Sequence, residues 1–222
     1  MDAGRSTWLE DPYTLEDMAN DAAGLLDTLG IRCAHVVGAS MGGFIGQLLA
    51  LNHPDRVLTL TSLISGPNGD DQVQPTAEGR AVLMAADPGT RDGRIEVGLQ
   101  SKKALLGPAD PFDEGYERAR IAAAVDRAFN PGGYLRQLQA ILAAPGRLGR
   151  LRSLRLPTLV VHGDADILVP IENGRNVAAA IPGARLVEIE GMGHDVPRRV
   201  WSRIADEIVA LARQADGAGD AC

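Results

Sequence analysis

The chain has 222 residues and a formal net charge of −7, and 45% of its residues are hydrophobic. This length and apolar content suffice for one domain with a substantial buried core, and they exclude a disordered or fibrous chain. The acidic balance argues against nucleic acid or an anionic membrane surface as a partner, because both would repel the chain. We therefore expect a protein that acts on small molecules.

The first stretch, residues 2–12, is polar and predicts a loop. The sequence shows no secretory leader, and none of its apolar runs is long enough to cross a bilayer, so we expect a cytoplasmic protein.

Thr14, with Asp17 three residues later, predicts the start of a helix, because the two side chains can cap it. Apolar residues then recur at helical spacing up to Gly30, which is placed to end the helix in a left-handed conformation.

A short buried strand, residues 34–37, runs into G-A-S-M-G-G at residues 38–43 and then into an apolar helix that ends near His53. The pattern G-x-S-x-G between a strand and a helix is typical of a tight turn that exposes a serine oxygen. Glycines are expected there because the backbone is strained and the strand and helix pack too closely for larger side chains. Ser40 is therefore a candidate nucleophile, and a purely structural turn serine is the alternative.

Residues 56–64 predict a second buried strand. From residue 66 to about residue 155 the pattern changes to helical segments punctuated by Pro and Gly, without a strand pattern. We expect this stretch to be a helical insertion, with its acidic pair Asp70 and Asp71 in a solvated loop. Its large apolar residues, more of them expected in the core of the insertion than on a pocket wall, include Leu83, Met84, Leu105, Leu106, Phe112, Ile141 and Leu142.

The next buried strand, residues 157–161, ends in H-G-D-A-D at residues 162–166, and a helix from about Ile171 to Ile181 follows. The two aspartates at this strand end, Asp164 and Asp166, are candidate acids. His162 lies inside the strand end, and we interpret it as structural.

A fourth strand, residues 184–189, leads into G-M-G-H at residues 191–194 and a closing helix through Leu211. Residues 215–222 form a Gly- and Ala-rich tail that we expect to be disordered. Strands that alternate with helices imply a mainly parallel sheet, with functional groups gathered at the carboxyl ends of the strands. His194 is at such an end.

Ser40, Asp166 and His194 each follow a predicted strand, in that order along the chain. A serine hydroxyl is a poor nucleophile at neutral pH, so it needs a base within hydrogen-bond reach and an acid that orients the base. The order Ser…Asp…His is the one expected of an α/β-hydrolase. We expect no metal site, because no pair of histidines shows ligand spacing on one element, and we expect no cofactor.

Taken together, G-A-S-M-G-G, H-G-D-A-D-I-L-V-P and G-M-G-H-D-V-P resemble the three marks of α/β-hydrolase-fold serine hydrolases, and the resemblance runs from Asp2 to about Ala212. Residues 13–17 and 35–42 are also similar to small esterases near the anthracycline methyl esterases. The resemblance implies the α/β-hydrolase fold. Its divisions are a core at residues 1–65 and 156–214, a cap or lid at residues 66–155, and the tail at residues 215–222.

By this resemblance Ser40 is the nucleophile, Asp166 the acid and His194 the base, while Asp164 orders its loop. The backbone N–H of Met41 is expected to hold the oxyanion. The implied activity is hydrolysis of a carboxylic ester, apolar or moderate in size, through an acyl-enzyme. Perhydrolase or haloperoxidase activity and carbon–carbon bond hydrolysis use the same triad and stay open, and so does a non-catalytic ligand- or partner-binding protein.

In this family the second oxyanion donor comes from a loop that would lie upstream of Met1. Matched residue by residue, the chain would begin after the fourth strand, so the N-terminal part of the sheet would be missing and the strand before Ser40 would become an edge. Because the loss of one oxyanion donor costs about 10² to 10³ in turnover, we expect weak catalysis. We also expect a tendency to form homodimers through the exposed edge.

Overall fold

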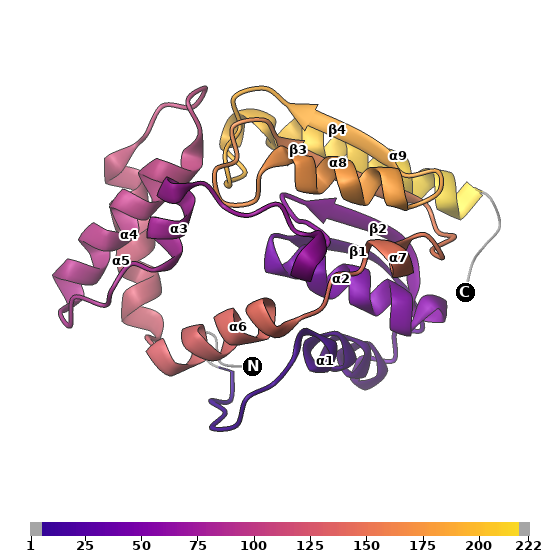
Figure 1. The fold of residues 1–222 in the computed structure, drawn as a ribbon, viewed down its shortest axis with the longest axis horizontal. Coiled ribbons are helices and arrows are strands. Elements are labelled where there is room, and N and C mark those ends of the chain that lie inside the picture. Colours follow the sequence, from indigo (N-terminus) through magenta and orange to yellow (C-terminus); the bar gives the residue numbers. More distant parts are fainter. Residues whose placement is uncertain (1–5, 218–222) are drawn as a thin grey trace.

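The computed structural model describes residues 6–217 of the chain. The predicted loop residues 2–5 and the predicted tail residues 218–222 lie outside the described residues. One parallel sheet runs through the molecule with its four strands in chain order (Figure 1). These strands are β1 (Ala34–Ala39), β2 (Val57–Leu63), β3 (Thr158–Gly163) and β4 (Arg185–Ile189). The predicted parallel sheet of alternating strands and helices is therefore confirmed.

Helices cover both faces of the sheet, and each face has its own apolar core. On one face α1 (Leu15–Thr28), α2 (Met41–Asn52) and α8 (Ile171–Ala180) pack over Leu60 and Val160. On the other face α9 (Trp201–Gly217) packs over neighbours of these two residues along the strands, Leu159 and Val161 among them. This alternation follows from the period of two along a strand, which sends successive side chains to opposite faces.

The start of α1 has the predicted capping box. The backbone N–H of Asp17 donates to Oγ1 of Thr14 at 3.1 Å, and the backbone N–H of Thr14 donates to Oδ2 of Asp17 at 2.8 Å. Gly30 follows the helix with φ 67°, in the left-handed region. The apolar stripe is buried only in the first part of the helix, because Leu25 and Leu29 are 58% and 60% exposed.

The described chain between β2 and β3 contains helices only, as predicted. They are α3 (Ala77–Leu83), α4 (Arg91–Leu106), α5 (Glu114–Arg127), α6 (Pro131–Ala143) and α7 (Leu148–Leu151). In Figure 1, α3, α4 and α5 stand beside the sheet, and α6 runs back toward α1. Short 3-10 turns occupy Pro54–Arg56, Gly69–Asp71 and Arg198–Val200.

The acidic pair at the start of this segment differs from the predicted solvated loop. Asp70 is exposed, but Oδ2 of Asp71 accepts the backbone N–H of Leu148 at 2.9 Å. Asp71 therefore holds the beginning of α7, a contact between residues far apart in sequence that a local pattern does not predict.

The closing helix is longer than expected. α9 extends through Gly217, so residues 215–217 are helical and the predicted disordered tail is wrong for them. The reason is the core-facing stripe, which continues from Leu211 to Ala215, where the residue is 7% exposed. None of the described helices combines the length and apolar character needed to cross a membrane.

β1 forms one border of the sheet. Among the described residues it pairs only with β2, and Val37 near its end is 47% exposed. The strand that leads to Ser40 is therefore an edge strand here, as the sequence predicted.

Candidate active site

Three loops at the same end of the sheet carry the predicted nucleophile, acid and base. Ser40 follows β1, Asp166 lies in the loop after β3, and His194 lies in the loop after β4. Because the strands are parallel, their carboxyl ends all point to this end of the sheet. The fold thereby brings together side chains that are far apart along the chain.

The imidazole of His194 makes a hydrogen bond with each of the other two side chains. Its Nε2 lies 2.8 Å from Oγ of Ser40, and its Nδ1 lies 2.8 Å from Oδ2 of Asp166. A carboxylate only accepts, so Nδ1 carries a proton and donates it to Asp166, which leaves Nε2 to accept the Ser40 hydroxyl. In this arrangement an imidazole can take a proton from a serine.

Ser40 occupies a strained turn between β1 and α2. Its φ is 52°, in the left-handed region that residues with a Cβ rarely adopt. The backbone N–H of Ser40 donates to the carbonyl of Leu63 at 2.9 Å, and the hydroxyl of Ser65 donates to the carbonyl of Ser40 at 2.9 Å. Contacts with β2 and with the chain just beyond it therefore hold the strained turn.

The glycines around Ser40 differ in what they contribute. A Cβ at Gly38 would lie 2.1 Å from the carbonyl oxygen of Gly42, and a Cβ at Gly43 would lie 2.5 Å from Cβ of Ser65. A Cβ at Gly42 would meet no atom within 4 Å. The expectation that close packing requires glycine is correct for Gly38 and Gly43. It is wrong for Gly42, because that position faces open space.

The side chain of Asp166 is buried and accepts hydrogen bonds from several directions. Its Oδ1 accepts the backbone N–H of Leu168 at 2.9 Å and that of Val169 at 2.8 Å. Burial raises the pKa of Asp166, but the hydrogen bonds from His162 and His194 outweigh burial and hold the pKa below its ordinary value. Asp166 is therefore ionised at neutral pH and can stabilise a protonated His194.

A second histidine contacts the same carboxylate. His162 is completely buried near the end of β3, with Nε2 2.7 Å from the carbonyl oxygen of Val169 and 3.4 Å from Oδ2 of Asp166. The sequence interpretation treated His162 as structural and missed this contact. Its place four residues before the acid, at the end of the same strand, is the signal that could have indicated it.

The alternative acid has a different place. Asp164 is exposed, and its Oδ1 accepts the backbone N–H of Gly191 at 2.6 Å, in the loop that leads to His194. The two other histidines have partners of their own. Nδ1 of His35 lies 3.0 Å from Oγ1 of Thr59, and Nε2 of His53 lies 2.8 Å from an amide oxygen on α1.

The backbone N–H of Met41 is the predicted oxyanion donor. Met41 is the first residue of α2 and directly follows Ser40. The N–H of a first helical residue has no acceptor within the helix, and the helix dipole favours negative charge at this end. A negative oxygen formed beside Ser40 can therefore be stabilised by this group.

The loop that carries His194 is held by the C-terminal end of α4. The backbone N–H of Gly193 donates to the carbonyl of Leu106 at 3.2 Å, and a Cβ at Gly193 would lie 2.2 Å from the carbonyl oxygen of Leu105. Lys102 on α4 forms an ion pair with Asp195, the residue after His194. The helical segment between β2 and β3 therefore contributes to the position of this loop.

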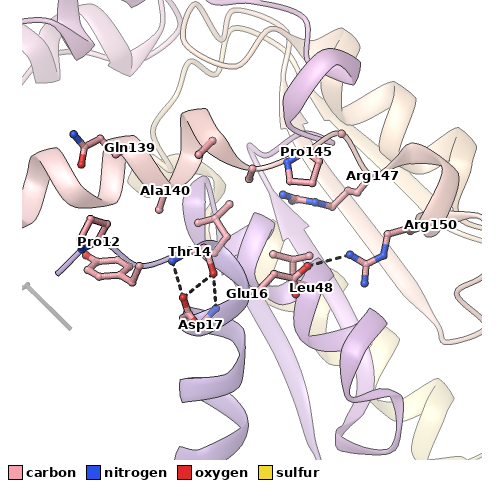
Figure 2. Close-up of a pocket in the computed structure, with 15 residues that line it drawn as sticks. Pro12, Thr14, Glu16, Asp17, Leu48, Gln139, Ala140, Pro145, Arg147 and Arg150 are labelled. Atoms are coloured by element: carbon pink, nitrogen blue, oxygen red, sulfur yellow. Dashed lines mark hydrogen bonds and ion pairs between the residues drawn. The ribbon is translucent and has the colours of Figure 1, made fainter.

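A cavity of about 380 Å³ lies between the start of α1, α2 and the end of α6 (Figure 2). Its lining does not include the three hydrogen-bonded side chains above. Arg150 is paired with Glu16 at 3.0 Å, as the dashed line in Figure 2 marks. The buried Arg147 donates to Oε1 of Gln47 at 3.3 Å, and burial lowers its pKa to about 10. These contacts join the end of the helical segment to α1 and α2.

Sequence comparison identifies relatives along most of the chain. A family model described as alpha/beta hydrolase fold matches residues 2–197. The chain is 33% identical over 236 aligned residues to rhodomycin D methylesterase DauP of Streptomyces sp. (strain C5), which covers 96% of this chain and 79% of that protein. It is 32% identical over 194 residues to a protein named as carbamate hydrolase RutD from Azorhizobium caulinodans, with 86% and 70% covered.

Structural comparison agrees with the sequence relatives. A hydrolase from Pseudomonas aeruginosa PA01 superposes with a TM-score of 0.71 at 27% sequence identity. The match covers 95% of this chain and 76% of that one. The resemblance drawn from the three sequence motifs is therefore confirmed at the level of the fold and of the esterase-like relatives.

Proposed function

The chain belongs to the alpha/beta hydrolase fold family and is a hydrolase, and from this premise we propose that it cleaves carboxylic esters through an acyl-enzyme on Ser40. In this proposal His194 is the base and Asp166 is the acid that orients it. The proposal is supported above all by the two 2.8 Å hydrogen bonds of His194, one to Ser40 and one to Asp166. The methylesterase relative supports an ester as the bond that is cleaved.

The proposed reaction has two halves that use the same base. Nε2 of His194 takes the proton of the Ser40 hydroxyl while Oγ attacks the ester carbonyl, and Asp166 stabilises the imidazolium. The imidazolium then gives this proton to the leaving alcohol, and the acyl group stays on Oγ. Water then gives a proton to His194 and attacks the acyl carbonyl. The bond between the carbonyl carbon and Oγ breaks, the imidazolium returns the proton to Oγ, and the acid is released.

The tetrahedral oxyanion of each half would be held by the backbone N–H of Met41 at the start of α2. This is the one donor that we assign among the described residues. Loss of one oxyanion donor typically costs about 10² to 10³ in turnover, so we expect the rate of hydrolysis to depend strongly on this N–H.

We assign the helical segment at residues 66–155 the role of a lid that receives the substrate. A cavity of about 550 Å³ within this segment is lined mainly by apolar side chains, Leu83 and Phe129 among them. Met84 and Leu142 in the same segment are 70% and 74% exposed. The lining of this cavity includes none of Ser40, Asp166 and His194, so we propose an apolar ester of moderate size from the apolar character of the segment alone. A methyl ester matches the name of the first relative, a methylesterase.

A fluorophosphonate probe tests the nucleophile directly, because it reacts with an activated serine. We expect one covalent label, on Ser40, that disappears in Ser40→Ala and is strongly reduced in His194→Ala. Hydrolysis of a p-nitrophenyl ester and of a methyl ester should fall in parallel with labelling. A folded wild-type chain that takes no label, or a Ser40→Ala variant that still takes it, would contradict the proposal.

A non-catalytic ligand- or partner-binding protein is the alternative that the labelling experiment tests. It predicts saturable ligand binding without labelling of Ser40. Perhydrolysis and carbon–carbon bond hydrolysis depend on the same three side chains. They are separated from ester hydrolysis by measuring peracid formation and the cleavage of a carbon–carbon substrate beside the ester assay.

Among the described residues one edge of β1 is unpaired, and from this we propose in addition that two copies of the chain pair along this strand. An edge strand presents unpaired backbone N–H and C=O groups to any strand that can pair with it. We expect a concentration-dependent dimer in analytical ultracentrifugation. Val37→Lys, which places a charge at the exposed end of β1, should weaken the dimer, whereas a monomer at all concentrations would contradict the proposal.

A further inference from the structure

His162 is held in one orientation by its hydrogen bonds. The carbonyl oxygen of Val169 can only accept, so the 2.7 Å contact requires that Nε2 of His162 carries a proton. The other ring nitrogen, Nδ1, is buried without a hydrogen-bond partner in the described structure. A Cβ at Gly174 would lie 2.4 Å from this Nδ1, so the ring packs directly against the backbone of α8.

A buried nitrogen without a hydrogen-bond partner costs free energy, so the contacts of the other ring nitrogen have to offset this cost. That nitrogen, Nε2, faces two groups in the loop after β3: the carbonyl of Val169 and, at 3.4 Å, Oδ2 of Asp166. Val169 in turn donates its backbone N–H to Oδ1 of Asp166 at 2.8 Å. His162 therefore fixes the loop that donates hydrogen bonds to Oδ1 of Asp166. The His162 ring itself lies against Oδ2 of the same carboxylate.

We propose that His162 is a positioning residue for the reaction: through its Nε2–H it holds the Asp166 carboxylate and the loop of residues 166–169 in the orientation that serves His194. This inference rests on the proposed function. The Nε2–H of His162 contacts the carbonyl of Val169 and the carboxylate of Asp166, and His162 acts on the substrate only through Asp166 and His194.

The loss of this N–H has a predictable effect on protonation. Without it the buried carboxylate is less well stabilised, so the coupled pair of Asp166 and His194 binds its protons more tightly. The acidic limb of the pH–rate profile should therefore move to higher pH. The turnover number should fall about tenfold, the change expected when one hydrogen bond to a charged group is lost. KM should stay within about twofold, because no contact with the substrate is removed.

Two substitutions at the same position separate donation from packing. His162→Leu removes the donor, and His162→Gln keeps an N–H at the distance of Nε2. We expect His162→Leu to show the fall in kcat and the shifted acidic limb with a p-nitrophenyl ester, and His162→Gln to recover most of both. Equal loss in the two variants, with no shift of the acidic limb, would overturn the proposal.

A control and a second perturbation lie on α8. Val177 is fully buried there in the core below the sheet, so Val177→Ala should lower stability and leave kcat and the acidic limb unchanged. Gly174→Ala instead places a Cβ against Nδ1 of the His162 ring and should displace the ring. It should lower kcat and shift the acidic limb in the same direction as His162→Leu. If Val177→Ala reproduces the effect of His162→Leu, the effect is general destabilisation and the proposal is wrong.

An NMR titration distinguishes a failure of this inference from a failure of the proposed function. In the Ser40→Ala background no turnover is needed, and the imidazole signals of His194 report the protonation of the pair. Adding His162→Leu to that background should raise the midpoint of the His194 titration, whereas His162→Gln should leave it near the parent value. An unchanged midpoint in both overturns the positioning role even if Ser40 is the nucleophile.

Discussion

The two sides of the site are supported in different ways. On the acid side, at the carboxyl end of β3 and residues 164–169, Asp166 is 5% exposed and accepts hydrogen bonds from two backbone N–H groups and from His194. On the nucleophile side, at the carboxyl end of β1 and residues 38–43, the strand pairs on one side only among the described residues, and Val37 is 47% exposed.

The chemistry of the two groups explains the difference. A buried carboxylate must be compensated from several directions, because an ionised group away from water is costly. A neutral serine requires only a turn that presents its oxygen, and the close packing of that turn is possible because Gly38 and Gly43 have no Cβ. The acid side therefore depends on several polar partners of one carboxylate, and the nucleophile side depends on close packing at two glycines.

The largest effect is expected at the nucleophile itself. Ser40→Ala should lower kcat/KM for a p-nitrophenyl ester by at least about 10⁴-fold, because no other group replaces the attacking oxygen. The acid side should stay intact, so the unfolding transition should change little. Ser153→Ala, on an exposed turn, should keep full activity. Residual activity of Ser40→Ala within tenfold of wild type would contradict the assignment.

The next effect distinguishes the two aspartates of the acid side. Asp166→Asn should lower kcat by about 10³ to 10⁴, since the amide no longer fixes the proton on Nδ1 of His194. Asp164→Asn should stay within about threefold, because that side chain is exposed and only accepts a loop N–H from Gly191. Steady-state kinetics on both variants tests the pair. The reverse order would make Asp164 the acid.

Much of this arrangement could be predicted from the sequence, because its signals are local. The Thr14 capping box and the glycine after α1 depend on residues within one helix turn, and the alternation of strands and helices depends on short apolar runs. The order of Ser40, Asp166 and His194 at strand ends predicted their meeting point, since parallel strands end on one side of the sheet.

What the sequence did not reveal depends on contacts between distant elements. The neighbours of α1 bury Ala19 and leave Leu25 exposed, although both lie on the predicted stripe. Lys102 reaches the loop of His194 from α4, and no local pattern joins the two. The contact of His162 with Asp166 could not be predicted, because a histidine inside a strand end resembles ordinary core packing until the hydrogen bond of its Nε2 to the loop after β3 is seen.

A smaller effect, on stability, tests the steric character of the nucleophile side. Gly43→Ala forces a Cβ to within 2.5 Å of Cβ of the buried Ser65, and it should lower the free energy of unfolding by about 1 to 3 kcal/mol. Gly42→Ala, one residue earlier in the same helix, meets no atom within 4 Å and should raise stability by up to about 1 kcal/mol. Urea unfolding of both variants measures this, and equal effects would contradict the steric explanation.

The smallest effect concerns the pH dependence of stability, which should be present on the acid side and absent on the nucleophile side. The pKa of Asp166 is held below its ordinary value in the folded chain, against about 3.9 in the unfolded chain. Its ionisation therefore stabilises the fold fully above about pH 3.9, and this contribution is lost as the pH falls through the folded pKa.

Asp166→Asn lacks the contribution, so its stability difference from wild type should shrink between pH 6 and pH 3 in urea unfolding. Ser40→Ala removes no charge, so its difference from wild type should be the same at both pH values. If the two differences change together, the carboxylate is not the group that sets the acid side apart.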